Sequence, residues 1–210
     1  MPLWGGRMKR IGGLIGLAFV AATQPVHGQE LGPFSIGMSF VQPRGAPDQP
    51  YLNRAVTDEH GNHLALTVDN KTGRVVYLEA DWNQKPEGAV SDVPGMTFGK
   101  TTLDEIRAAM GSNGFAYNGA PTGRTQDGAI VLSNAYEIDK TGGVVAVFVT
   151  RVSPERARAA QGQADPKPGQ LALLDAVILA DPAYLAQLWD GKFGRPDPTY
   201  KPAPWPKAKP

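Results

Sequence analysis

The sequence predicts an α+β protein in which two antiparallel β meanders carry two short helices packed on the sheet. Turn sequences with Asp or Asn first and Gly fourth recur between apolar runs, which is typical of hairpin loops. Segments with the apolar spacing of an amphipathic helix are few and short. The three turns are Asp58-Glu59-His60-Gly61, Asn70-Lys71-Thr72-Gly73 and Asp139-Lys140-Thr141-Gly142.

Residues 1–28 have the layout of a secretory signal peptide. Basic residues precede an apolar run from Ile11 to Ala22, which is shorter than the roughly 20 residues that span a membrane. Cleavage is expected after Ala22 or after Gly28, and translation begins at Met1 or at Met8; the sequence leaves both choices open. We therefore expect a periplasmic or secreted protein with no transmembrane segment after cleavage.

Composition excludes several classes of function. The absence of cysteine excludes a lipid-bearing cysteine anchor, a disulfide, a thiol nucleophile and a thiolate metal site. Loss of Arg7, Lys9 and Arg10 leaves 18 basic residues against 20 acidic ones, a mature net charge of about −2. Nothing in this balance favours nucleic acid as a partner.

An N-terminal unit, residues 29–94, is expected to be rich in β structure. Its strand-like runs are Tyr51 to Thr57, His63 to Val68 and Arg74 to Trp82. Apolar and small or polar residues alternate along the middle run, which is typical of a strand with one buried face. Three such runs joined by tight turns predict a meander.

A C-terminal α+β unit, residues 95–190, repeats this pattern with runs at Ala129 to Ile138, Val144 to Val152 and Leu171 to Ala180. The middle run is almost continuously apolar, which favours a central strand covered on both faces. Helices are expected at Leu103 to Met110 and at Ala183 to Asp190.

Three further segments complete the expected organisation. A polar helix is predicted from Pro154 to Gln161, followed by a loop through Gly169. Residues 191–210 form a proline-rich tail, expected to be extended chain or disorder. Phe34 to Ser39 resembles Met96 to Thr101, and this weak repeat favours duplication of one unit, with chance similarity as the alternative.

The letters Gly99-Lys100-Thr101-Thr102 suggest a phosphate-binding loop, but the spacing excludes one. Such a loop needs four residues between its first Gly and the Gly-Lys pair, whereas Gly95 and Gly99 enclose three. Thr102 with Glu105 instead predicts a capping box at the start of a helix.

Asp58, His60 and His63 form the cluster with metal-ligand character, because imidazole and carboxylate suit zinc or copper. The alternative is an ordinary hairpin surface. No serine elbow or distinctive carboxylate pair is present, so we expect no enzyme, no catalytic residue and no cofactor.

Four residues are candidates for partner binding. Tyr117 lies in a glycine-rich segment, Ser112 to Gly128, expected to form a mobile rim, and Arg151 could receive an anionic group. Tyr200 and Trp205 alternate with lysines in the tail, which could lie on a partner groove or on the cell wall; a disordered basic end is the alternative.

The segment that begins Met96-Thr97-Phe98-Gly99-Lys100-Thr101-Thr102-Leu103-Asp104-Glu105-Ile106 resembles the opening of small envelope modules of the SmpA/OmlA and β-lactamase-inhibitor-like type. The resemblance covers residues 96–152. It implies helices on one face of an antiparallel sheet and a non-enzymatic binding or assembly role, and it transfers no functional residue. The chain departs from the lipoprotein members by lacking their cysteine.

These observations predict an exported, non-enzymatic binding or envelope-assembly protein whose partner is a protein or an envelope component. The partner-binding surface is expected on the sheet face or on the rim. The alternative is a small periplasmic enzyme or metal-binding protein that uses Asp58, His60 and His63.

Overall fold

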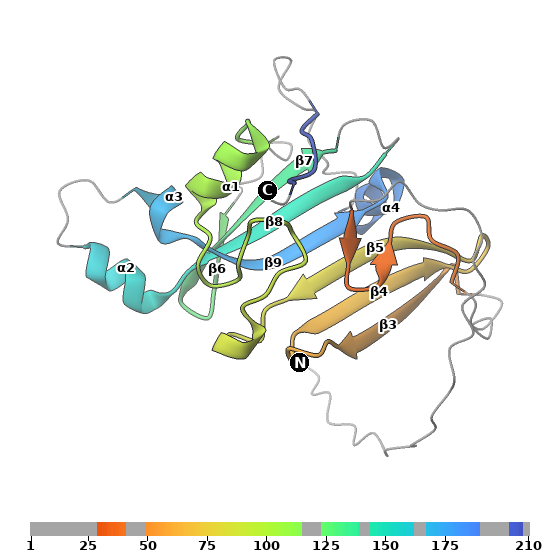
Figure 1. Cartoon of the computed structure of the whole chain (residues 1–210), viewed down its shortest axis with the longest axis horizontal. Coiled ribbons are helices and arrows are strands. Elements are labelled where there is room, and N and C mark those ends of the chain that lie inside the picture. The colour runs from red at the N-terminus through yellow and green to blue at the C-terminus, as the bar shows by residue number, and fades with distance from the viewer. Residues whose placement is uncertain are drawn as a thin grey trace.

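The computed structural model describes residues 29–40, 49–114, 123–138, 143–161, 167–189 and 202–207. A seven-stranded antiparallel sheet and a two-stranded hairpin carry a few short helices (Figure 1). The predicted α+β class is confirmed. None of the helices in these ranges has the length and apolar character needed to cross a bilayer.

The large sheet has the strand order β3-β4-β5-β9-β8-β7-β6. Its strands are β3 (Tyr51–Thr57), β4 (His63–Asp69), β5 (Arg74–Asp81), β9 (Leu173–Ala180), β8 (Val145–Val152), β7 (Ala129–Glu137) and β6 (Gly123–Gln126). The hairpin is β1 (Glu30–Leu31) and β2 (Phe34–Ser35). The helices are η1 (Pro86–Gly88), α1 (Leu103–Met110), α2 (Pro154–Ala160), α3 (Pro168–Leu171) and α4 (Pro182–Leu188).

Both predicted meanders are present, and they join edge to edge because β5 pairs with β9. The five paired positions run from Tyr77 opposite Ala180 to Asp81 opposite Ala176, with Glu79 opposite Ile178 at the centre. Antiparallel pairing of the last strand of each meander relates the two halves of the sheet by an approximate two-fold axis at that central pair.

A β-bulge repeats at the corresponding place in each half. The β4–β5 register shifts between Thr67 and Val68, and the β8–β9 register shifts between Val149 and Thr150. In each case the last strand of the meander carries one extra residue, which locally disrupts the ladder and increases the twist.

The extra residues of the two bulges, Val76 and Asp175, cross-link the halves. The Trp82 backbone N–H donates to the carbonyl of Asp175, and the Asp181 backbone N–H donates to the carbonyl of Val76, each at 2.9 Å. The hydrogen bonds therefore obey the same two-fold relation as the strands.

The weak sequence repeat also has matching structure. The Gly37 N–H donates to the Val75 carbonyl on β5, and the Gly99 N–H donates to the Leu174 carbonyl on β9, each at 2.8 Å. Both glycines have positive φ, at 82° and 68°. Equivalent backbone positions thus attach each repeat to its own meander, while duplication itself stays a prediction.

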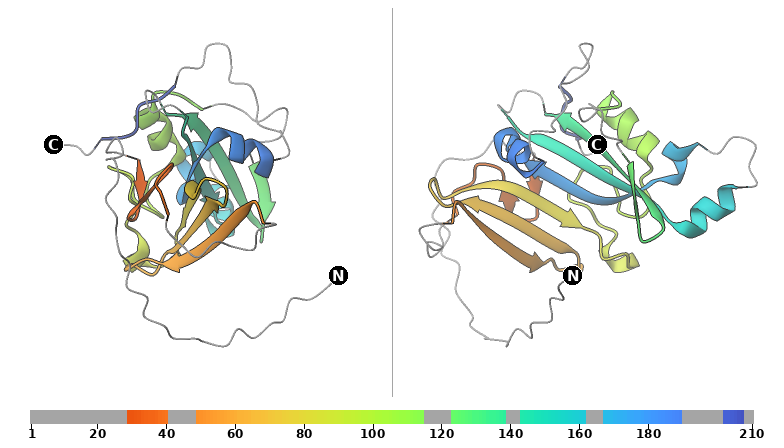
Figure 2. Two further views of the ribbon diagram at one scale, coloured as in Figure 1. Left: turned by 90° about the vertical axis from the view of Figure 1, so that its right-hand side faces the viewer. Right: turned by 180° about the vertical axis from the view of Figure 1, so that it is seen from behind.

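Two layers cover the sheet, one on each face, as the left view of Figure 2 shows. Helix α1 and the β1–β2 hairpin cover one face, which we call the α1 face, and helix α4 lies on the other, which we call the α4 face. The main core lies on the α1 face and spans both halves; its fully buried members include Leu66, Leu78, Ile106, Tyr136, Phe148 and Leu179.

The central strand β8 confirms the expected burial on both faces, since the side chains from Val145 to Phe148 are all inaccessible to solvent. Four features were not expected from the sequence: strand β6, the β1–β2 hairpin, the short helix η1, and helix α3, which replaces part of the loop predicted before Gly169. In the second turn, Asp69 rather than Asn70 accepts the turn N–H groups of Lys71 and Thr72. The turn at residues 139–142 lies outside the described ranges.

Candidate functional site

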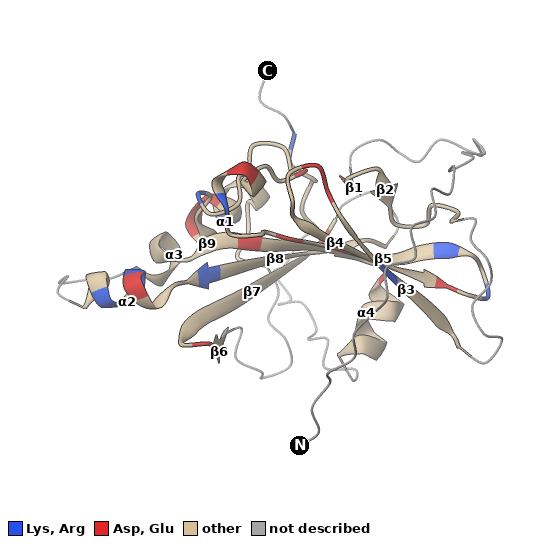
Figure 3. Cartoon of the chain, turned by 90° about the horizontal axis from the view of Figure 1, so that it is seen from below, with Lys and Arg blue, Asp and Glu red and all other residues tan. Residues whose placement is uncertain are grey.

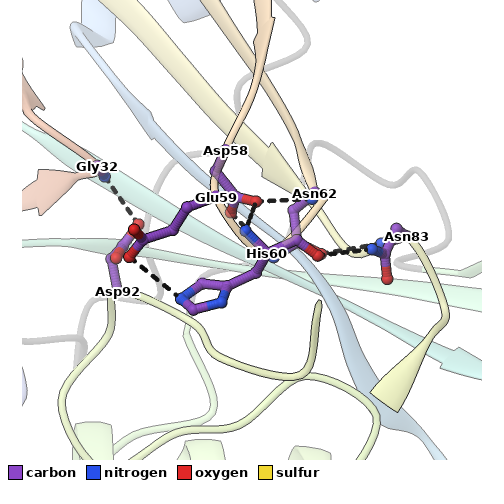
Figure 4. A network of polar contacts seen from close by, with 7 residues as sticks. All are labelled: Gly32, Asp58, Glu59, His60, Asn62, Asn83 and Asp92. Carbon is purple, nitrogen blue, oxygen red and sulfur yellow. Dashed lines mark hydrogen bonds and ion pairs between the residues drawn. The ribbon is translucent and has the colours of Figure 1, made fainter. Parts of the chain in front are cut away.

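Two residues of the predicted metal cluster, Asp58 and His60, lie in the β3–β4 turn (Figure 4), and the third, His63, begins β4. One carboxylate oxygen of Asp58 accepts the N–H groups of His60 and Asn62 at 2.8 and 2.7 Å, and the other accepts from the Asn62 side chain at 3.0 Å. Asn62 is buried, and its side-chain Oδ1 accepts the backbone N–H of Asn83 at 3.1 Å. Asp58 is therefore occupied in fastening the β3–β4 turn to the chain after β5.

The two histidines approach different carboxylates. His60 lies 3.6 Å from Glu59, and His63 lies 3.9 Å from Asp81 on the neighbouring strand. Within the described ranges, no group of three or more His, Asp or Glu side chains is arranged to hold a metal ion. The geometry gives the metal hypothesis no support.

The segment from Gly99 to Glu105 begins helix α1, as the capping box predicts. The Glu105 N–H donates to the Thr102 hydroxyl at 3.2 Å, and the Thr102 N–H donates to the Glu105 carboxylate at 2.7 Å. These hydrogen bonds from Thr102 lower the pKa of Glu105. The Gly99 N–H donates a hydrogen bond to the Leu174 carbonyl. It therefore attaches the segment to β9 and does not serve a phosphate-binding loop.

The structure describes two of the four predicted partner-binding residues, Arg151 and Trp205, and these lie on opposite faces of the sheet. Tyr117 and Tyr200 lie outside the described ranges, as does most of the predicted rim. Arg151 is half-buried on β8, and the strand register places it on the α4 face.

Trp205 lies on the opposite face from Arg151 and stacks on Phe148, with ring centroids 6.4 Å apart. The N–H of Ala203 donates to the Glu137 carbonyl at 2.9 Å. Residues 202–207 are therefore extended chain held against the sheet, which corrects the alternative of a disordered end for this part of the tail.

Helix α4 covers one half of the α4 face, a surface that we call the α4 seat: Val145, Val147, Ile178 and Ala180. Asp181 caps the helix by accepting the N–H groups of Ala183 and Tyr184, and proline at the first helical position favours this start. Leu185 is fully buried against the seat.

Aromatic contacts hold the outer side of the same helix. The Tyr184 ring lies edge-on to Tyr51 and Tyr77, at centroid distances of 4.8 and 5.8 Å. The Tyr51 hydroxyl donates to the Gln187 side chain at 2.6 Å. Helix α4 therefore reaches across the sheet as far as β3, and it leaves the other end of the α4 face without a helix of the described chain (Figure 3).

That other end is acidic. Glu79 and Asp81 alternate along β5 and face the same side, and Asp175 in the β9 bulge lies beside them. We call this surface the open acidic face; it comprises the partly exposed Glu79, Asp81, Asp175 and Ala65 beside the buried Ala176, with His63 and Arg151 at its margins. The side chains of Asp81 and His63 are 46% and 56% exposed.

The carboxylates of the open acidic face influence one another. Partial burial, with a smaller effect of the neighbouring Glu79, raises the pKa of Asp81 to about 6. Partial burial also raises the pKa of Asp175, and Arg151 opposes that rise. The Tyr77 hydroxyl donates to Glu79 at 2.7 Å, and burial together with that carboxylate raises the tyrosine pKa. Crowded carboxylates of this kind favour a cationic partner.

A signal for part of this surface was present in the sequence. Tyr77, Glu79 and Asp81 occupy alternate positions of a predicted strand, so they must share a face. Asp175 gave no such signal, because only the bulge brings it to that side.

The fold and this surface define a class: an α+β protein with a continuous antiparallel sheet, one face of which is partly open and acidic. Comparisons with protein-family models, with curated proteins and with solved structures found no match for this chain.

Proposed function

We propose that this chain is an exported, non-enzymatic binding or envelope-assembly protein that holds a protein partner on its open acidic face. The observation that carries the proposal is the gathering of Glu79, Asp81 and Asp175 on a solvent-accessible part of the sheet. A rigid sheet presents side chains at fixed spacing, so it loses little conformational freedom when a partner binds.

Two further points support this role. The predicted signal peptide directs the chain to the envelope. The resemblance of residues 96–152 to envelope modules of the SmpA/OmlA and β-lactamase-inhibitor-like type implies binding rather than turnover.

The location of the partner can be tested by site-specific photo-crosslinking in the native envelope. A photoreactive residue replaces Ala65 in the open acidic face, and in a matched variant it replaces Val56, which is 46% exposed on the other face. We expect a specific protein adduct from position 65 only. Equal adducts from both positions, or none from position 65, would contradict the proposal.

Export is tested separately by mass spectrometry of the chain recovered from the envelope fraction. The expected N-terminus is Thr23 or Gln29, which follow the two predicted cleavage positions. Recovery of the chain only from the cytoplasm, with Met1 or Met8 retained, would overturn the export part of the proposal.

A further inference from the structure

We infer that the partner of the open acidic face is a basic amphipathic helix, laid on the sheet at the position that the two-fold axis relates to the α4 seat. This inference rests on the proposed function, and it adds the shape and the chemistry of the partner.

The two-fold relation identifies the position of such a helix. Applied to the strand register, the axis carries Val145, Val147, Ile178 and Ala180 of the α4 seat onto His63, Ala65, Glu79 and Asp81. The open acidic face is thus the counterpart of the surface on which α4 lies. Its strands pair in the same antiparallel register as those of the α4 seat, and the helix laid on that seat is seven residues long.

Among the described residues no helix lies at this position, because the segments after β5 and β9 leave the sheet on opposite faces. After β9, Asp181 caps α4 on the α4 face. After β5, the ring of Trp82 packs on the α1 face, and its Nε1–H donates to the Lys85 carbonyl at 3.0 Å. The backbone N–H groups of Trp82 and Asp181 make equivalent hydrogen bonds across the two-fold axis, but the chain then continues on opposite faces of the sheet.

The side chains of the α4 seat and of the open acidic face differ, and this difference predicts how the partner helix differs from α4. Helix α4 places an apolar Leu185 on apolar residues. In the open acidic face, Glu79, Asp81 and Asp175 outnumber the margin cation Arg151, while Ala65 and Ala176 leave the centre shallow. A helix that fits here needs small or aliphatic residues toward the alanines and lysine or arginine toward the carboxylates, as in other helix-on-surface complexes.

The inference is tested with synthetic helical peptides and the mature chain, by fluorescence anisotropy at low salt. One peptide of about 14 residues carries leucine on one face and lysine on the other, and its matched control carries glutamate in place of lysine. We expect the lysine peptide to bind at least tenfold more tightly, and we expect added salt to weaken it, because the contacts are exposed ion pairs.

Charge variants assign the binding to the surface. The triple variant Glu79→Gln, Asp81→Asn, Asp175→Asn should weaken binding roughly tenfold, the sum of three modest ion pairs. A control with the same change in net charge, Glu30→Gln, Glu59→Gln, Glu87→Gln, removes exposed carboxylates elsewhere and should change binding less than about twofold. Equal loss in both variants would overturn the inference.

A steric variant separates docking from general attraction. Ala65→Trp keeps every charge and fills the centre of the surface, so it should abolish binding, while Val56→Trp on the other face should not. Binding unaffected by Ala65→Trp would overturn the inference. So would a crosslink from position 65 to a second copy of this chain.

Failure of this inference can be told from failure of the proposed function. An envelope adduct from position 65 without binding of the lysine peptide leaves the binding role standing and rejects the basic helix. If the lysine peptide binds and both the charge variants and the steric variants change its binding as expected, but no envelope adduct forms, the helix position is supported and the proposed role is not.

Discussion

The two halves of the sheet have the same strand pairing and the same bulge but opposite surface chemistry on the α4 face. At corresponding positions, β9 presents Ala176, Ile178 and Ala180, whereas β5 presents Tyr77, Glu79 and Asp81. Helix α4 packs on the apolar residues of β9 and on Tyr77 near the start of β5, whereas Glu79 and Asp81 farther along β5 carry charge. Backbone geometry alone therefore does not decide whether a sheet face becomes core or binding surface; the alternate side chains of one strand decide it.

The difference extends to the residue that follows each strand. Asp181 accepts two N–H groups and begins a helix, while Trp82 turns its ring to the core and lies against Gly99. An aspartate that caps and an aromatic ring that needs burial send equivalent chain ends in opposite directions.

The largest effect on stability is expected from a cavity made at the junction of the two halves. Leu179 on β9 pairs with Leu78 on β5, and both are fully buried. Leu179→Ala should lower the free energy of unfolding by about 2–5 kcal/mol, because buried leucine is lost and a cavity remains. Urea denaturation measures the change.

The same experiment asks whether the halves unfold together. With fluorinated tryptophan, ¹⁹F NMR gives separate signals for Trp82 in the first half and Trp189 after α4. Because the main core spans both halves, the two signals should change at one urea concentration, in the wild type and in Leu179→Ala. Separate midpoints would show that the halves are independent units. Val56→Ala, at an exposed position, should shift neither midpoint appreciably.

A smaller effect distinguishes the two repeated glycines. Gly37→Ala should cost about 1 kcal/mol, because the position has positive φ and open space around it. Gly99→Ala should cost about 2 kcal/mol more, because its Cβ would also collide with the Trp82 ring. Urea denaturation of both variants is the measurement, and equal losses would mean that the ring moves aside freely.

The smallest effect is the pH dependence of stability from Asp81. Its pKa is raised from 3.8 to about 6 in the folded chain, so the folded chain binds more protons than the unfolded chain between these values. This group therefore lowers stability as pH rises from about 4 to 6. Asp81→Asn should be more stable than the wild type at pH 7, by at most about 1 kcal/mol because the side chain is half exposed.

Thermal unfolding at pH 4 and pH 7 measures this difference. We expect the gain of Asp81→Asn to be absent or reversed at pH 4 and present at pH 7. A gain that is equal at both values would contradict the assignment. Asp127→Asn, at the exposed β6–β7 turn, is the control and should leave the pH dependence of the wild type in place.

The local parts of the fold were predictable and the long-range parts were not. The bounds of β3 and α1 agree with the prediction because strand alternation and a capping box are read from neighbouring residues. The β5–β9 pairing gave no signal, since apolar strands can pair in many orders. Trp205 was predicted to meet a partner from its tail context, and its contact with Phe148 depends on a strand distant in sequence.

The candidate surface shows the same division. Strand alternation predicted that Glu79 and Asp81 share a face, but it could not say which face lacks a helix. The third carboxylate, Asp175, joins them through a bulge that strict alternation does not foresee. In the described part of the chain the predicted histidine cluster is not arranged to hold a metal ion, and its aspartate accepts hydrogen bonds from the turn.

The pairing of β5 with β9 also has a consequence for the order of folding. The partners are roughly 100 residues apart in the chain, and contacts of that separation form slowly because a long loop must close first. Until β9 is in place, the first meander has a bare edge at β5, and a bare edge is a template for pairing with other chains. Strand β9, the last strand in the described part of the chain, thus also covers the β5 edge of the first meander and protects that edge from pairing with other chains.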